Sequence, residues 1–92
     1  MQTQRSNFAL CGMPMEKFAF VIGGQNQTGV LNTVDRFNLQ TKKWEQLPKM
    51  NVPRVQAGAC AINGDVYVFC GENSVGILNS IEKLSNASGL RN

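Results

Sequence analysis

The sequence predicts an all-β fold made of two similar sheets of antiparallel strands. Three observations support this fold class: the chain repeats itself, its apolar segments are short, and an Asn-Gly pair joins two of these segments. Short segments rich in β-branched and aromatic residues, ended by glycine or by polar turn residues, are typical of buried strands. A helical period is not needed to explain any part of the chain.

The repeat relates residues 18–37 to residues 65–84 without a gap. The shift is 47 residues, which is the separation of Gly24 and Gly71. The identical pairs are Val21/Val68, Gly24/Gly71, Asn26/Asn73, Gly29/Gly76, Leu31/Leu78 and Asn32/Asn79. Periods of about 40 to 50 residues belong to four-stranded β-propeller blades or to helical arrays, and the strand-like segments favour the blades.

The apolar segments and turn residues give the expected strands. The first repeat predicts a strand that ends near Met13 and strands over 18–22, 33–38 and 43–47, and the second predicts strands over 57–62 and 65–70. The small residues at 57–61 fit an innermost strand, because blades converge on the propeller axis. The first repeat is therefore expected to form a complete blade.

The Asn63-Gly64 pair favours a type I′ turn, which sets the register of the hairpin around it. Ile62 is expected opposite Asp65, Cys60 opposite Tyr67, and Ala57 opposite Cys70. Cys60 and Cys70 are then too far apart for the Cα separation of about 5.5 Å that a disulfide needs. We expect all three cysteines to be free thiols.

A set of spaced residues resembles the kelch motif over Arg5 to Leu84. In order, they are Gly23-Gly24, Asp35, Phe37, Trp44, Met50, Pro53-Arg54 and Gly58. The second repeat departs from the motif where Cys70 replaces a glycine and Leu84 replaces an aromatic residue. The resemblance implies an all-β, kelch-type β-propeller fragment of about two four-stranded antiparallel blades. Its expected parts are a first blade (5–50), an incomplete second blade (51–84) and a C-terminal tail (85–92).

The motif residues are interpreted as structural. Gly24 and Gly71 would allow a backbone conformation or a close approach that a Cβ forbids. Trp44 would be a packing anchor between blades. Arg5 and Arg54 would form hydrogen bonds within or between blades, with Asp35 and Glu82 as the expected partners.

Composition argues against several classes of function. The sequence has no histidine, which removes Ser-His-Asp and Cys-His catalysis and imidazole metal sites. The cysteine spacing matches no zinc pattern, and Gly23-Gly24 lacks the residues of a phosphate loop. A net charge of +3 from scattered basic residues argues against nucleic acid. Neither a signal peptide nor a membrane span is expected, so we expect a cytoplasmic protein. Together with the missing histidines and metal patterns, this predicts a non-enzymatic protein without cofactor or metal.

The resemblance implies a protein-interaction module that binds a partner through loops at one face of the propeller. These loops are residues 25–31, 72–77 and 49–56. The expected partner-binding residues are Asn26, Gln27, Asn73, Ser74, Arg54 and Gln56, although the loop residues could equally be solvated turn residues. An adaptor of a ubiquitin ligase is one possible setting. A structural or scaffolding propeller, associated with the cytoskeleton or actin, is the alternative.

A propeller of about four to eight blades is needed to cover both apolar faces of every blade. A bare face with several large apolar side chains would forfeit on the order of 10 kcal/mol, which is comparable with the whole stability of a small domain. We therefore expect either self-association or a place in a longer propeller.

Overall fold

The computed structural model describes residues 5–84, which form strands and no helix. Four strands form an antiparallel sheet in the order β1 (Ala9–Met13), β2 (Phe18–Ile22), β5 (Val34–Asn38), β6 (Lys43–Leu47). A second sheet has the order β11 (Ile81–Lys83), β8 (Asp65–Phe69), β7 (Gly58–Ile62). Two short hairpins complete the fold, β3 (Gln25–Asn26) with β4 (Gly29–Val30) and β9 (Glu72–Asn73) with β10 (Gly76–Ile77).

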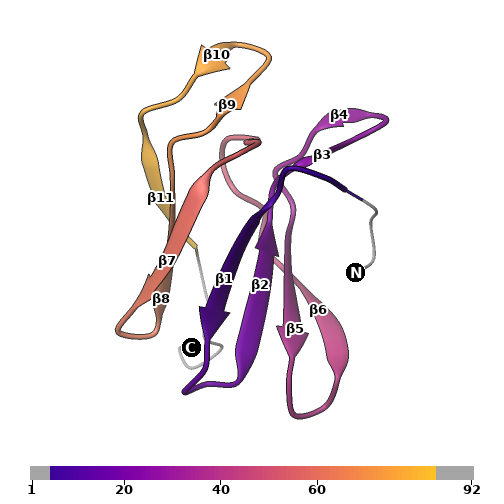
Figure 1. Ribbon diagram of the computed structural model, residues 1–92, viewed down its shortest axis with the longest axis vertical. Coiled ribbons are helices and arrows are strands. Elements are labelled where there is room, and N and C mark those ends of the chain that lie inside the picture. The colour runs from indigo at the N-terminus through magenta and orange to yellow at the C-terminus, as the bar shows by residue number, and fades with distance from the viewer. Residues whose placement is uncertain (1–4, 85–92) are drawn as a thin grey trace.

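The two sheets are the two blades of the β-propeller fragment that the sequence predicted (Figure 1). The first blade has four strands and the second has three within the described residues. The division of the chain at residue 50 stays a prediction, and the expected tail at 85–92 lies outside the described residues. Within residues 5–84, there is no helix long and apolar enough to cross a membrane.

The strand predictions are confirmed nearly residue for residue. Register is set by the turns, and β7 pairs with β8 through the expected contacts Ile62–Asp65 and Cys60–Tyr67. All three cysteines are free thiols, as expected. The short hairpins β3–β4 and β9–β10 were expected only as loops.

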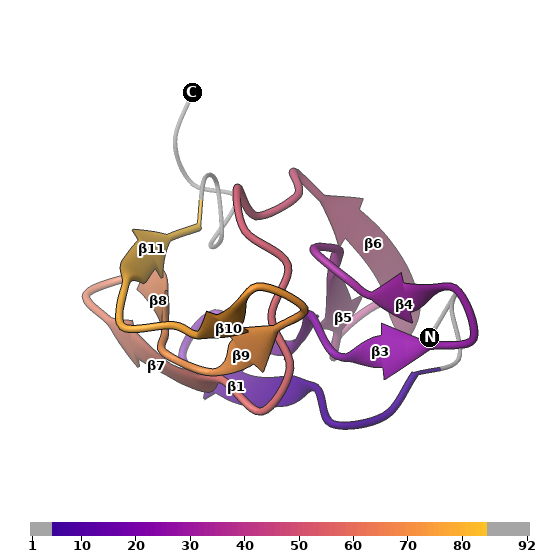
Figure 2. The ribbon, with the colours of Figure 1, turned by 90° about the horizontal axis from the view of Figure 1, so that it is seen from above.

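The core lies between one face of the first blade and one face of the second. Because side chains alternate along a strand, every second residue of β1 and β2 points toward the second blade. Phe20, Ile22, Val66 and Val68 are at most 1% exposed. β1 lies beside β7, whose alanines pack against this core (Figure 2). These small side chains let the two inner strands approach closely, as the sequence predicted.

Trp44 does not lie between the two described blades. It pairs with Phe37 across β5 and β6, with ring centroids 5.0 Å apart. Alternation along the strands places both rings on the face that points away from the second blade. Trp44 therefore forms an aromatic pair within its sheet, and the expected packing anchor between blades stays a prediction for the face that points away from the second blade.

Candidate protein-interaction surface

Both short hairpins lie at the same end of the sheets, opposite the turns that join β1 to β2 and β7 to β8 (Figure 1). The segment that joins the blades passes between them (Figure 2). We call residues 25–31, residues 72–77 and the joining segment, residues 49–56, the hairpin rim. It contains every residue that the sequence singled out for partner binding.

The joining segment is tied to both blades by backbone hydrogen bonds. Arg54 N–H donates to the carbonyl of Leu31 at 3.1 Å, and the Arg54 carbonyl accepts from Gly24 N–H at 2.8 Å. On the other side, Val55 and Glu72 exchange a pair of bonds at 2.9 and 3.0 Å. A segment held from both sides in this way presents its neighbouring side chains in a fixed position.

Two glycines lie where a neighbouring backbone segment approaches closely, Gly24 beside the segment before β1 and Gly71 beside the joining segment. Gly24 has φ +95°, and a Cβ there would lie 2.7 Å from the Ser6 carbonyl oxygen. Gly71 has φ +87°, and its Cβ would lie 2.6 Å from the Val55 carbonyl oxygen. Both the left-handed conformation and the crowding select glycine, as the sequence predicted.

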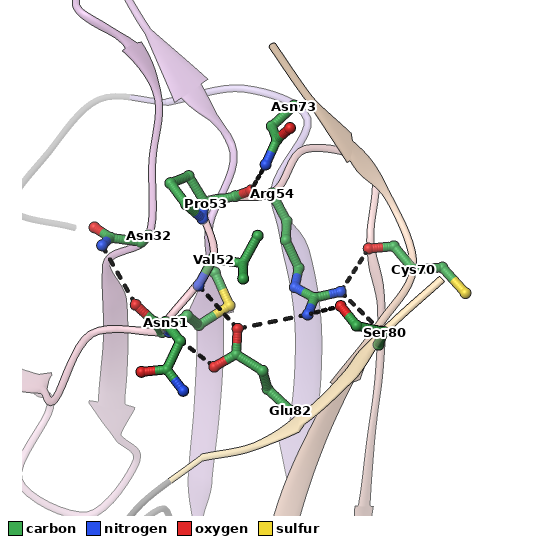
Figure 3. Close-up of polar contacts among 10 residues, drawn as sticks. Asn32, Asn51, Val52, Pro53, Arg54, Cys70, Asn73, Ser80 and Glu82 are labelled. Carbon is green, nitrogen blue, oxygen red and sulfur yellow. Dashed lines mark hydrogen bonds and ion pairs between the residues drawn. The ribbon is translucent and has the colours of Figure 1, made fainter. Parts of the chain in front are cut away.

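Arg54 fixes the joining segment to the second blade from inside (Figure 3). Its guanidinium donates to the carbonyls of Cys70 and Ser80 at 2.8 and 3.0 Å and to the Ser80 hydroxyl at 2.9 Å. It also meets the Glu82 carboxylate at 3.5 Å. Because the residue is only 1% exposed, its side chain offers no surface to a partner, and any part it plays in binding is to position the rim.

Glu82 links the same cluster to the backbone of the joining segment. Its carboxylate accepts hydrogen bonds from Asn51 N–H at 2.8 Å and from Val52 N–H at 3.0 Å. On the first blade, Asn32 donates its side-chain amide to the Met50 carbonyl at 3.3 Å. These contacts fix residues 50–52, the first part of the joining segment, to both blades.

Arg5 makes the matching contacts in the first blade. It donates to the Gly23 and Thr33 carbonyls at 3.0 and 3.4 Å and pairs with Asp35 at 2.7 Å. Burial lowers the pKa of Arg5 below its ordinary value, although the Asp35 charge acts in the opposite direction. The expected pairs are both present: Arg5–Asp35 holds the segment before β1 to the first blade, and Arg54–Glu82 holds the joining segment to the second.

Asn26 and Asn73 shape their hairpins from matching positions. The Asn26 side-chain oxygen accepts from the Thr28 backbone and hydroxyl at 2.9 and 2.6 Å. The Asn73 oxygen accepts from Val75 N–H at 2.9 Å, and its amide donates to the Pro53 carbonyl at 2.9 Å. Both side chains therefore stabilise their turns by hydrogen bonds, and both are half-exposed.

Of the residues expected to bind a partner, Gln27, Ser74 and Gln56 are exposed. Sequence reasoning missed two apolar neighbours on the second hairpin, Val75 and Ile77, which are 91% and 89% exposed. The repeat carries a signal for Val75, since its counterpart in the first repeat is the polar Thr28. The structure brings polar and apolar groups together on one hairpin tip.

Comparison with known proteins agrees with this architecture. The kelch motif matches the chain twice, at residues 20–51 and 53–85. The chain belongs to the kelch-repeat family. Kelch repeats are generally modules for protein interaction.

The chain is similar to several curated kelch proteins. It is 33% identical over 69 residues to Kelch repeat and BTB domain-containing protein 2 of Cowpox virus, covering 68% of the chain and 12% of that protein. An F-box/kelch-repeat protein of Arabidopsis thaliana is 40% identical over 52 residues, covering 56% and 15%. Human Kelch-like protein 23 is 31% identical over 78 residues, covering 83% and 13%. The chain thus spans a small part of these relatives' length.

Proposed function

We propose that this kelch-repeat chain is a non-catalytic module that binds a protein partner through the hairpin rim. The observation that carries the proposal is the way the rim is held. Backbone bonds and a buried arginine fix the joining segment, while Gln27, Ser74 and Gln56 stay exposed beside it. Groups held in place before binding lose less conformational freedom when a partner docks.

The expected partner-binding residues that are exposed favour a partner surface with hydrogen-bonding groups and an apolar element, beside the exposed charges of Lys49 and Glu72. Gln27, Ser74 and Gln56 can each donate and accept hydrogen bonds, and none carries a charge. Val75 and Ile77 add exposed aliphatic area beside them. A catalytic role has little support, since the sequence lacks histidine and residues 5–84 hold no group of metal-binding side chains.

The names of the relatives pair kelch repeats with a BTB or an F-box domain. We propose that, within a longer protein of that kind, the rim would be the part that recognises the partner, as in an adaptor of a ubiquitin ligase. A cytoplasmic setting is expected for such a protein.

The test compares two triple variants in affinity purification from native extract with mass spectrometry. Gln27→Ala, Ser74→Ala and Gln56→Ala alter the rim, whereas Gln40→Ala, Thr41→Ala and Lys42→Ala alter exposed residues of the β5–β6 turn at the other end (Figure 1). The proposal expects specific partners to be lost with the rim variant and kept with the turn variant. Partners that depend on the turn and not on the rim would contradict it.

A further inference from the structure

Each blade has one face that no other sheet covers within the described residues, although the Arg5 side chain covers Asp35 on the first blade's open face. On the second blade this open face carries Cys60, Ile62, Tyr67, Phe69 and Ile81, which alternate with the residues that point toward the first blade. On the first blade it carries Leu10, Ala19, Phe37 and Trp44. Ile81, the first residue of β11, and Leu10, within β1, are each 67% exposed. Both faces expose apolar side chains.

The repeat makes these two open faces counterparts of the two halves of the existing interface. The open face of the second blade has the same positions in the repeat as the face of the first blade that packs against the second. The pairs are Cys11/Cys60, Phe20/Tyr67, Ile22/Phe69 and Val34/Ile81. In turn, the open face of the first blade has the same positions as the face of the second blade that packs against the first, in the pairs Ala59/Leu10, Val66/Ala19 and Leu84/Phe37. One chain thus carries both halves of a second interface of the same kind.

The backbone groups that join the blades recur as well. Between the blades, the Arg54 backbone bonds to Gly24 N–H and to the Leu31 carbonyl. The second blade has Gly71 and Leu78 at these positions, joined to each other at 2.8 Å as Gly24 and Leu31 are. The counterpart of Arg54 in the first repeat is Arg5.

We propose that the open face of the second blade binds the first blade of a second copy of this chain, head to tail. The contact is heterologous, so its repetition gives a ring if the rotation closes. Propellers of about four to eight blades would correspond to two to four copies. A second copy is the occupant because the complementary face is on the chain itself and the blade-to-blade contact within the chain shows how the two fit.

Cys70 makes the contact between copies looser than the contact within one chain. Its counterpart is Gly23, where a Cβ would lie 2.5 Å from the Arg54 carbonyl oxygen. Cys70 has φ +62° and carries that Cβ. The carbonyl oxygen of Arg5 from the second copy would overlap the Cys70 Cβ. The second copy therefore docks with its Arg5 segment shifted away from Cys70.

The proposal is tested by sedimentation velocity at micromolar concentration on two variants that each block one open face. Leu10→Lys blocks the first blade and Ile81→Lys blocks the second, and both positions are exposed, so folding should persist in circular dichroism. We expect the parent to form assemblies larger than a monomer, each variant to be monomeric, and an equal mixture of the two to form a dimer. Val75→Lys, on the rim and outside both faces, is the matched control and should assemble like the parent.

Three results would overturn the proposal: a monomeric parent, a variant that still dimerises alone, or a mixture that stays monomeric.

Cys70→Gly should tighten the association by about tenfold, because it removes an overlap of the kind seen in overpacked interfaces. Cys70→Ala keeps the Cβ and should match the parent. Equal tightening by both substitutions would refute the steric role of Cys70. None of these results depends on partner binding at the rim.

Discussion

Cys11 on β1 and Cys60 on β7 occupy matching positions in the two blades, yet one is buried and the other exposed. Cys11 lies on the face that the second blade covers, whereas Cys60 lies on the open face. The strands around them have similar patterns of apolar residues. Burial in this fold is therefore decided by whether another sheet lies over the face, and each blade depends on a neighbour for its core.

The two buried arginines differ in a similar way. The Arg5 and Asp35 side chains are 0% and 2% exposed, whereas Glu82, the partner of Arg54, is 13% exposed. Arg54 compensates with a further bond to the Ser80 hydroxyl, which Arg5 does not make to Thr33 within the described residues. The same arginine–carboxylate arrangement therefore forms with a fully buried carboxylate and with a partly exposed one.

The largest effect is expected from removing an arginine. Arg5→Met and Arg54→Met each leave a carboxylate and several carbonyls inside the blade, so each should lower the free energy of unfolding by about 3 to 5 kcal/mol. Arg36→Met is the control, because the Arg36–Glu45 pair is partly exposed and should contribute about 1 kcal/mol or less. Urea unfolding measures all three. An Arg54→Met protein as stable as the parent would rule out the structural role of the charge pair.

Substitution of the two crowded glycines should have the next largest effect. Gly24→Ala and Gly71→Ala force a Cβ against a carbonyl oxygen in a left-handed conformation, which should cost about 2 kcal/mol or more. Gly12→Ala is the control, since nothing lies within 4 Å of its added Cβ and its change should stay within about 0.5 kcal/mol. Similar losses at Gly12 and Gly24 in urea unfolding would show that crowding is not the cause.

The sequence was sufficient for the strands and for the register of the β7–β8 hairpin, because alternation and the Asn63-Gly64 turn are local signals. Both arginine–carboxylate pairs were expected from the resemblance to the kelch motif, since residues about 30 positions apart leave no local signal. The sequence left open on which face of the first blade Trp44 lies, because that face depends on how β6 pairs within the sheet. The exposed apolar side chains of the second hairpin also escaped prediction. Val75 and Ile77 lie in segment 72–77, which the sequence predicted only as a loop.

A smaller difference is expected between the two hairpin asparagines. Asn73 donates to the Pro53 carbonyl as well as bonding within its own turn, whereas in the described part of the chain Asn26 bonds only within its turn. Asn73→Ala should therefore cost about 1 kcal/mol, roughly 4 to 8 °C in melting temperature for a chain of this size, and Asn26→Ala less. Thermal unfolding followed by circular dichroism gives both values. A larger loss at Asn26 would contradict the role of the Asn73–Pro53 contact.

The smallest effect concerns pH. Burial, with a lesser contribution from Cys60, raises the pKa of the Cys11 thiol in the folded protein. The folded state then binds this proton more tightly than the unfolded state does. The contribution of the neutral thiol to the free energy of unfolding is complete below the pKa of the unfolded state, about 8.5, and is lost as the pH rises through the pKa of the folded state. Cys11→Ala should flatten the decline of unfolding free energy above that pH. An unchanged slope would argue against a buried thiol at this position.

The packing of one blade face against the other is tested most directly by the rates at which iodoacetamide alkylates Cys11 and Cys60, followed by mass spectrometry at low protein concentration. The structure predicts fast modification of Cys60 and slow modification of Cys11 in the folded protein, with the two rates becoming similar in urea. Equal rates in the folded protein would mean that the second blade does not cover the first.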